Sequence, residues 1–269
     1  MSDIAIGIVG CGGRMGRTLL QQVYQTEGVT LTGGTEAEGH HALGLDLGVL
    51  AGLESPLDMI ATTDRQALFE ASDVVIDFTI PETTALLTKL AVETNTAHII
   101  GTTGLDAEQA QAIIDASKET VVVQADNYSL GVNLLAALTR QVAETLDTQF
   151  DIEIVEMHHR YKVDAPSGTA LALGRAAAEG RGVALDDVAD RGRDGITGAR
   201  KEGDIGFASL RGGNVVGDHT VTFAADDERI ELTHKAGDRT IFARGAVHAA
   251  RWAHSQPAGY YTMADVLGF

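Results

Sequence analysis

The residues with the clearest chemical potential lie in the segment from Glu156 to Ala170. Two adjacent histidines, His158 and His159, stand just before Lys162. Histidine titrates near neutrality and an ammonium group donates protons, so this segment can supply general acid–base chemistry. A fully extended chain would hold His158 and Lys162 roughly 13 Å apart. We therefore expect the chain to curl off a strand between these two residues.

An anion site is predicted directly after the lysine. Ser167 has the character of a helix N-cap, with Pro166 before it and a helix predicted from Thr169 to about Glu179. The backbone N–H groups of Gly168 and Thr169 and the helix dipole favour a carboxylate there, and glycine permits its close approach. A histidine pair or a Ser-Gly-Thr helix start is common in packing and capping. Their combination with Lys162 indicates an enzyme that acts on a carboxylated substrate.

A glycine-rich loop lies near the start of the chain, between a predicted strand (residues 3–9) and a predicted helix (residues 17–25). Strand, glycine loop and helix form the context of a dinucleotide-binding turn, in which backbone N–H groups hold a pyrophosphate. The glycines at positions 10, 13 and 16 depart from strict G-x-G-x-x-G, and such a turn also serves close packing. Cofactor contacts are expected at Gly10, Cys11, Gly12, Gly13, Arg14 and Met15.

Glu36 strengthens the prediction of a dinucleotide site. It ends a second predicted strand, residues 29–35, and lies twenty positions after Gly16. An acidic residue there accepts hydrogen bonds from the adenosine ribose of NAD. Ala37 follows, so no adjacent arginine is offered to a 2′-phosphate, although Arg14 could still meet one. The predicted cofactor is NADH and/or NADPH, with NADH favoured; the alternative is that Glu36 is only a solvated loop carboxylate.

The rest of the first half alternates strands and helices. Alternation of this kind predicts an α/β fold with a doubly wound, Rossmann-type parallel sheet. Ligands in such sheets bind beyond the carboxyl ends of the strands, where polar turns occur here. The predicted strands are residues 73–78, 97–100 and 120–124, and the predicted helices are residues 81–93 and 107–117. Further cofactor contacts are expected at Gly101, Thr102, Thr103, Ala125, Asp126, Asn127 and Tyr128.

The second half has a different order of elements. A run of strands behind one or two helices predicts a smaller α+β domain with a mixed or antiparallel sheet. Residues 180–202 are rich in Gly, Asp and Arg and are predicted to form a long loop. The remaining predicted elements are helices at residues 132–146 and 240–252 and strands at residues 151–157, 205–211, 214–224 and 229–234.

Composition bounds the class of protein. A chain of 269 residues with 44% hydrophobic residues can bury a core in each of two domains. The net charge of −18 argues against nucleic-acid binding, which requires basic patches. Cys11 is the only cysteine, which excludes an intrachain disulfide and a cysteine-based metal cluster. Neither a membrane-spanning run nor a signal peptide is evident, so a cytoplasmic location is expected.

These motifs resemble those of the 4-hydroxy-tetrahydrodipicolinate reductase (dihydrodipicolinate reductase) family. The resemblance spans essentially the full length, and the run from Glu156 to Ala170 is its most specific part. The motifs are Val9-Gly10-Cys11-Gly12-Gly13-Arg14-Met15-Gly16, Ile76-Asp77-Phe78-Thr79, Ile100-Gly101-Thr102-Thr103-Gly104, Asn127-Tyr128-Ser129-Leu130-Gly131-Val132-Asn133 and that run.

The resemblance implies reduction of 4-hydroxy-tetrahydrodipicolinate to tetrahydrodipicolinate in lysine and diaminopimelate biosynthesis. It implies that His158 is the acid/base residue, that Lys162 donates a proton to the reduced substrate, and that His159 contacts the substrate. Gly168 and Thr169 would hold a carboxylate, and no metal is expected. It also implies a dinucleotide-binding domain of residues 1–128 and 240–269, a substrate-binding and oligomerisation domain of residues 129–239, and a homotetramer.

Departures from the family pattern concern the cofactor. Ala37 replaces an arginine that often supports NADPH, and Asp126 and Tyr128 stand where Ala and Phe are common. Other classes remain open: another NAD(P)-dependent imine reductase or amino-acid dehydrogenase, or a non-catalytic dinucleotide-binding protein. A pure binder has no need of Lys162. A metal-dependent hydrolase built on His158, His159 and Asp164 is disfavoured because adjacent side chains on an extended segment point apart.

Overall fold

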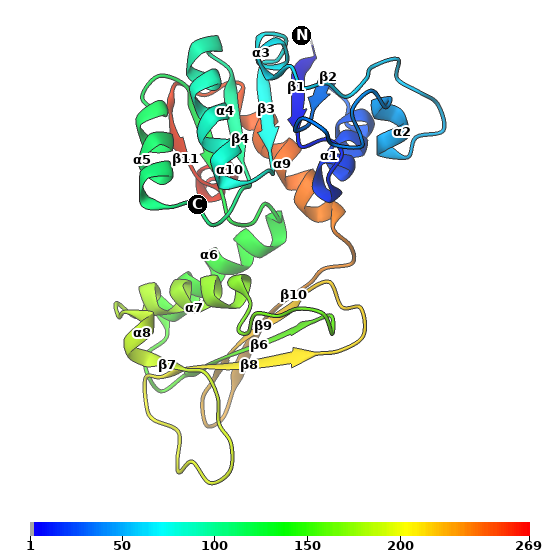
Figure 1. Cartoon of the computed structure of the whole chain (residues 1–269). Helices are drawn as coiled ribbons and strands as arrows, with labels where there is room; N and C mark the ends of the chain where they lie inside the picture. The colour runs from blue at the N-terminus through cyan, green and yellow to red at the C-terminus, as the bar shows by residue number, and fades with distance from the viewer. Residues whose placement is uncertain (1–2) are drawn as a thin grey trace. The chain divides into compact units, whose positions relative to one another are not determined.

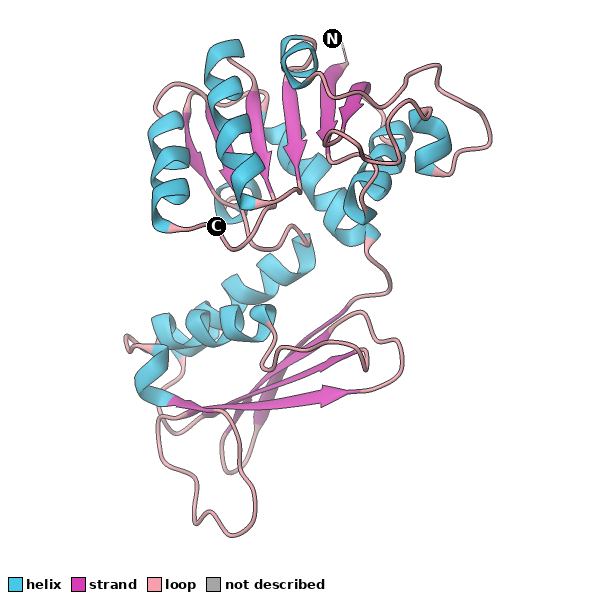
Figure 2. Cartoon of the chain, viewed as in Figure 1, coloured by secondary structure: helices cyan, strands magenta, loops and turns pink. Residues whose placement is uncertain are grey.

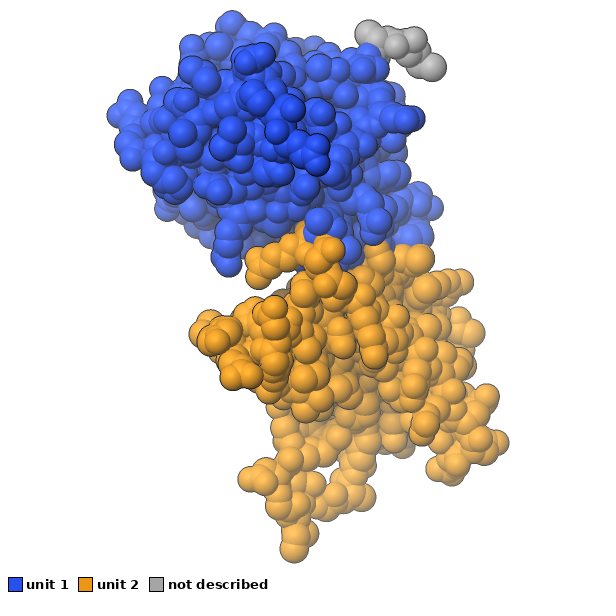
Figure 3. Space-filling view, turned by 90° about the vertical axis from the view of Figure 1, so that its right-hand side faces the viewer, with its two compact units in different colours: residues 1–130, 240–269 blue, residues 131–239 orange. Residues whose placement is uncertain are grey.

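The chain folds into two compact units. The computed structural model describes residues 3–269. One unit combines the described residues up to Leu130 with Thr240–Phe269, and the other is the continuous segment Gly131–Arg239 (Figure 3). No helix among residues 3–269 has the length and apolar character needed to cross a membrane.

Unit 1 is built on a six-stranded sheet in which every neighbouring pair is parallel, in the order β11-β5-β4-β3-β1-β2 (Figures 1 and 2). Helices cover both faces, so the central strands are buried on both sides and read as nearly continuous apolar runs. The strands are β1 (Ile4–Val9), β2 (Val29–Thr35), β3 (Val74–Asp77), β4 (Ala97–Ile100), β5 (Val121–Gln124) and β11 (Gly259–Tyr261). The helices are α1 (Arg14–Gln25), α2 (Leu47–Ala51), α3 (Arg65–Glu70), α4 (Pro81–Thr94), α5 (Ala107–Ala116), α9 (Thr240–Ala253) and α10 (Met263–Leu267).

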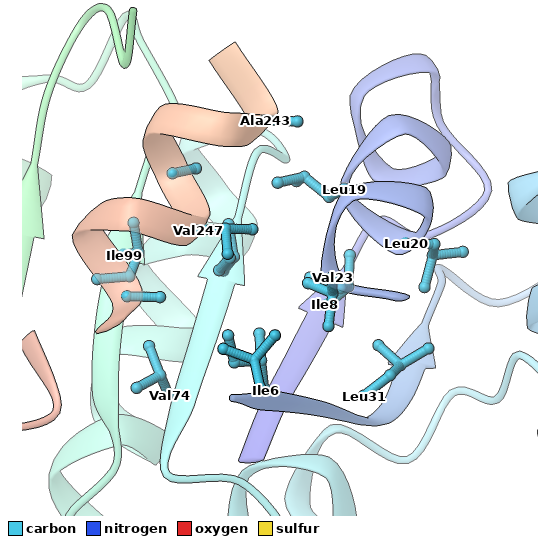
Figure 4. Packing of buried hydrophobic residues seen from close by; sticks show 14 of the residues in the cluster. Ile6, Ile8, Leu19, Leu20, Val23, Leu31, Val74, Ile99, Ala243 and Val247 are labelled. Carbon is cyan, nitrogen blue, oxygen red and sulfur yellow. The ribbon is translucent and has the colours of Figure 1, made fainter. Parts of the chain in front are cut away.

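The main core of unit 1 joins the two ends of the chain. Helix α1 presents its leucines toward the strands while α9, from the C-terminal segment, packs beside it (Figure 4). Gly245 of α9 lies against the carbonyl oxygen of Tyr128, where a Cβ would collide with that backbone atom. The labelled core residues are Ile6, Ile8, Leu19, Leu20, Val23, Leu31, Val74, Ile99, Ala243 and Val247.

Unit 2 contains a five-stranded mixed sheet in the order β10-β9-β6-β8-β7. Helices α6 and α7 lie over one face of this sheet (Figure 1). The even-numbered residues of β6 are buried on the covered face, because successive side chains of a strand point to opposite faces. The strands are β6 (Asp151–His158), β7 (Ala189–Asp190), β8 (Ile205–Arg211), β9 (Asp218–Ala224) and β10 (Arg229–Lys235), and the helices are α6 (Leu130–Thr145), α7 (Gly168–Gly180) and α8 (Leu185–Val188).

The predicted fold class, a Rossmann-type parallel sheet followed by a mixed sheet, is confirmed. Two predicted elements are wrong in detail. The expected loop at residues 180–202 contains α8 and β7, and the strand expected from Asn214 begins only at Asp218. Four short elements, α2, α3, β11 and α10, carry too few residues to show periodicity, so the sequence pattern did not predict them.

Candidate active site

The glycine loop connects β1 to α1 and is shaped by close backbone contacts. Gly10 has a φ of +72°, which side-chain-bearing residues rarely adopt. A Cβ on Gly16 would collide with the carbonyl oxygen of Gly10, so only glycine lets α1 start this close to the loop. Gly13 occupies the N-cap position and makes no side-chain cap hydrogen bond. The first turn of α1 is therefore open to an anion, which fits the pyrophosphate of a dinucleotide.

The Glu36 carboxylate lies directly against this loop. Its Oε1 accepts a 2.8 Å hydrogen bond from the backbone N–H of Gly12, and Oε2 accepts one from the N–H of Ala37. His40 Nδ1 lies 3.9 Å from Oε2. Glu36 is only 9% exposed, so it is not a solvated loop carboxylate. Its oxygens are already hydrogen-bonded to backbone N–H groups of the protein. Any ribose hydroxyl that it binds must share these oxygens with the loop.

Cys11, predicted as a cofactor contact, is a fully buried part of the core. Burial and the nearby charge of Glu36 raise the pKa of its thiol to about 12. The Cys11 side chain is thus an inert apolar group, and only its backbone can serve a ligand.

The turns after β3, β4 and β5 end at the same edge of the sheet as the glycine loop. Beneath them, the buried Asp77 accepts hydrogen bonds from the Thr79 hydroxyl and the Thr84 hydroxyl, each at 2.6 Å. Burial acts to raise the pKa of Asp77, but the neighbouring His98, whose Nε2 lies 3.4 Å away, and hydrogen bonds from the threonines outweigh it and hold the pKa below its usual range. The carboxylate therefore anchors these turns as an ionised group.

The predicted contacts at this edge divide into two kinds. The Thr102 side chain joins the buried threonine cluster around Asp77, and the Tyr128 hydroxyl donates to the carbonyl oxygens of Ile100 and Val123. These two side chains hold the strand ends together and face the core. Asn127 Oδ1 accepts from Ser129 N–H, and Ala125 N–H donates to Ile100. Of the predicted contacts at this edge, Thr103 and Asp126 are exposed, and Gly101, Ala125 and Asn127 are partly buried.

In unit 2, His158 is the last residue of β6 and its imidazole meets a buried carboxylate. His158 Nδ1 lies 2.6 Å from Oε2 of Glu156, which is 1% exposed. Arg211, at the end of the neighbouring strand β8, donates two 2.8 Å bonds to the same carboxylate. Burial acts to raise the pKa of Glu156, but hydrogen bonds from Arg211 and His158 outweigh it and lower the pKa to about 2. An ionised carboxylate only accepts, so a hydrogen bond at this contact requires a proton on Nδ1 of His158.

A second histidine lies behind His158. The rings of His158 and His219 meet edge to face with centroids 5.1 Å apart, and His219 Nε2 lies 3.1 Å from Ser167 Oγ. Burial, and then the neighbouring His158, lower the pKa of His219 to about 4. His219 is consequently neutral at neutral pH and connects β9 to the start of α7.

The start of α7 has the predicted cap. Ser167 Oγ accepts from the Ala170 N–H, and the Ser167 N–H donates to Oε1 of Glu156. Around Gly168 there is open space, because a Cβ there would meet no atom within 4 Å. Gly168 and Thr169 thus form the first turn of α7, at the positive end of the helix dipole, which is suited to a carboxylate.

Lys162 and His159 follow β6 in a short turn in which Lys162 N–H donates to the His159 carbonyl. The Lys162 ammonium lies 2.8 Å from Asp164 Oδ1, and its charge contributes to the lowered pKa of His219. His159 Nδ1 is buried and has no partner among the described residues. An orphaned ring nitrogen of this kind is an available contact for a ligand.

Sequence reasoning missed the roles of Glu156, Arg211 and His219. Glu156 could have been found, since a residue two positions before His158 on a strand faces the same side. Arg211 and His219 are 55 and 52 positions from their partners Glu156 and Ser167, and only the strand register brings them there. Asp164 was considered only as a metal ligand, and within residues 3–269 no group of three or more His, Cys, Asp or Glu side chains is arranged to hold a metal.

Comparisons with known proteins cover both units. Residues 4–128 match the family described as "Dihydrodipicolinate reductase, N-terminus", and residues 131–267 match "Dihydrodipicolinate reductase, C-terminus". A 4-hydroxy-tetrahydrodipicolinate reductase of Parvibaculum lavamentivorans is 60% identical over 267 residues, 99% of this chain and 98% of that protein. One from Rhodopseudomonas palustris is 56% identical over 268 residues, 100% of this chain and 98% of that protein.

Solved structures share the fold. A dipicolinate-bound dihydrodipicolinate reductase from Paenisporosarcina sp. TG-14 aligns with a TM-score of 0.78 at 24% identity, covering 97% of each chain. A probable dehydrogenase from Thermotoga maritima aligns with a TM-score of 0.61 at 12% identity, covering 98% of this chain and 92% of that one. At these identities the likeness concerns the architecture alone.

Proposed function

The chain belongs to the dihydrodipicolinate reductase family, and we propose that it reduces 4-hydroxy-tetrahydrodipicolinate to tetrahydrodipicolinate in lysine and diaminopimelate biosynthesis. The observation that carries this proposal is the full-length relationship, at 60% identity, to a reductase of that name. The reaction consumes NAD(P)H and a proton and releases NAD(P)⁺ and water as the 4-hydroxyl is lost. A reduced nicotinamide, when bound, would supply the hydride.

The chain's own residues are assigned to proton handling and carboxylate binding. His158 presents Nε2 to the substrate as acid/base group. Gly217 lies close to this edge of the ring, since a Cβ there would come within 3.0 Å of Nε2. Lys162 exchanges its Asp164 partner for the substrate and donates a proton to the reduced product. The orphaned Nδ1 of His159 and the open N-terminus of α7 at Gly168 support their assignment to the dicarboxylate.

NADH is the proposed preferred cofactor. The Rossmann-type unit accommodates NAD(P)H, and the finer preference depends on Glu36. Its carboxylate beside Gly12 repels a 2′-phosphate, and Ala37 offers no cation to offset that repulsion. Other expected properties are part of the same proposal: a cytoplasmic location, a homotetramer, and contacts at the sheet edge from Gly101 to Thr103 and from Ala125 to Tyr128. Thr102 and Tyr128 would make theirs through the backbone, because their side chains are buried.

The proposed function is tested by coupling the protein to freshly made dihydrodipicolinate synthase product and following the absorbance of NADH and NADPH in parallel. We expect rapid oxidation that requires the synthase product and is faster with NADH. Absence of oxidation with either nucleotide would contradict the proposed reaction, and equal rates at limiting nucleotide would contradict the NADH preference. Light scattering on the purified protein tests the tetramer.

A further inference from the structure

We propose that Glu156, held by Arg211, is a positioning residue that fixes the tautomer of His158, so that Nε2 is the nitrogen presented to the substrate. This inference rests on the proposed function, because it assigns a purpose to Nε2. It is independent of which nucleotide the enzyme prefers. It concerns residues that are not themselves in contact with substrate.

The strand geometry places the carboxylate and the imidazole together. Glu156 and His158 are two positions apart on β6, so both side chains project from the face that α7 covers. The 2.6 Å separation between Glu156 Oε2 and His158 Nδ1 is short for a hydrogen bond and typical of one to an ionised acceptor. A carboxylate in this position excludes the tautomer whose Nδ1 lacks a proton, because two acceptors would then face each other.

Arg211 prevents the carboxylate from rotating away from the ring. Its Nη1 and Nη2 bond to Oε2 and Oε1 of Glu156, and the Ser167 N–H bonds to Oε1 as well. Each carboxylate oxygen therefore has at least two donors. Arg211 Nη2 also donates to the carbonyl of Asp164, which ties the carboxylate to the segment that carries Lys162. One arginine thus aligns both proton-handling residues.

A purely structural ion pair is the simplest alternative, and the same strand supplies an example of it. Glu153 is bonded by Arg193 at 2.8 Å and by Arg200 at 2.9 Å on the opposite face of β6, with no histidine in contact. Glu153 is partly exposed, whereas Glu156 is 1% exposed, and burying an ion pair rarely repays its desolvation. What distinguishes Glu156 is its further partner, the imidazole of His158.

The test compares Glu156→Gln with Glu153→Gln, which removes the same charge from the same strand. A glutamine amide presents one donor and one acceptor, so it conflicts with one of the present donors and no longer enforces the Nδ1–H form. We expect Glu156→Gln to lower kcat about 100-fold with little change in KM, at the lower end of what general acid–base catalysis contributes. Arg211→Lys keeps a charge but loses the two parallel bonds, and its loss should be smaller. Glu153→Gln should retain wild-type kcat.

A second readout is the tautomer itself, measured from the ring nitrogen shifts of nitrogen-15-labelled histidine and assigned with His158→Asn. We expect the Nδ1–H form in the wild type and in Glu153→Gln, and a mixture in Glu156→Gln. An Nε2–H form in the wild type would overturn the inference, even if Glu156→Gln failed to fold. Equal kcat losses in the two glutamine variants would overturn it as well. If His158→Asn abolished turnover while Glu156→Gln did not lower it, the proposed function would stand and the positioning role would fail.

Discussion

The glycine loop of unit 1 and the His158 centre of unit 2 are both proposed to receive a charged ligand, but the loop is built from backbone groups and the His158 centre from side chains. The loop consists of backbone N–H groups at the start of α1, and its shape depends on side chains that are absent at Gly10 and Gly16. The His158 centre consists of ionisable side chains that fix one another through Glu156 and Arg211. Substitutions that add side-chain atoms should therefore disrupt the loop. Substitutions that remove a charge or a hydrogen-bond donor should disrupt the His158 centre.

The largest expected effect is on the chemistry of unit 2. Replacing His158 or Lys162 by alanine should lower kcat about 1000-fold, within the range that general acid–base groups contribute. Steady-state rates with the synthase-coupled substrate measure it, and retained NADH binding serves as the control. Turnover near wild type in either variant would remove that residue from the proposed mechanism.

A matched pair of glycine substitutions sharpens the comparison next. In Gly16→Ala the new methyl group collides with the Gly10 carbonyl, so we expect a loss of about 3 kcal/mol in the free energy of unfolding. Gly168→Ala meets no atom within 4 Å and should change it by less than about 0.5 kcal/mol. Denaturant unfolding measures both changes.

The same two variants should also differ in binding. Gly16→Ala should weaken NADH binding, measured by nucleotide fluorescence. Gly168→Ala should raise the KM for the substrate about tenfold, which corresponds to 1.4 kcal/mol, by obstructing the carboxylate. If Gly168→Ala left KM unchanged, the start of α7 would lose its assignment as the carboxylate site.

His219 gives unit 2 a dependence of stability on pH on the acid side of neutrality. Its folded-state pKa, about 4, is below the ordinary value of 6.5, so the unfolded chain takes up the proton first as the pH falls. The part of the free energy of unfolding that is linked to His219 is therefore fully present above pH 6.5 and is lost as the pH falls toward 4. The loss from this group is at most about 3 kcal/mol. Urea unfolding across this range should show a shallower decline in His219→Gln. Equal slopes in the variant and the wild type would contradict the buried neutral histidine.

The smallest expected effect is on nucleotide choice. Ala37→Arg places a cation beside the position where a 2′-phosphate would lie, and it should move the ratio of kcat/KM values about tenfold toward NADPH. Ala37→Gln is the uncharged control of similar length. An unchanged ratio in Ala37→Arg would mean that Glu36 and its surroundings do not face the ribose.

The two regions also differ in how far the sequence revealed them. The loop could be predicted because its glycines, its strand and its helix are adjacent in the chain, and the structure has all three in that order. Ser167 as an N-cap was predicted for the same reason and is confirmed. Arg211 and His219 could not be predicted, because the register of β8 and β9 against β6 brings them to Glu156 and Ser167. The spacing of neighbouring residues predicts local structure, whereas the register between strands depends on the whole sheet and cannot be predicted from a short segment.

The return of the C-terminal segment to unit 1 has a consequence for biosynthesis on the ribosome. Unit 2 is a continuous segment, Gly131–Arg239, and its residues are all made before α9, β11 and α10 exist. The sheet of unit 1 cannot gain its edge strand, nor α1 its neighbour α9, until the last thirty residues emerge. Nascent chains therefore carry an incomplete unit 1 sheet together with a fully synthesised unit 2, so unit 1, whose first strands are made earliest, is completed last.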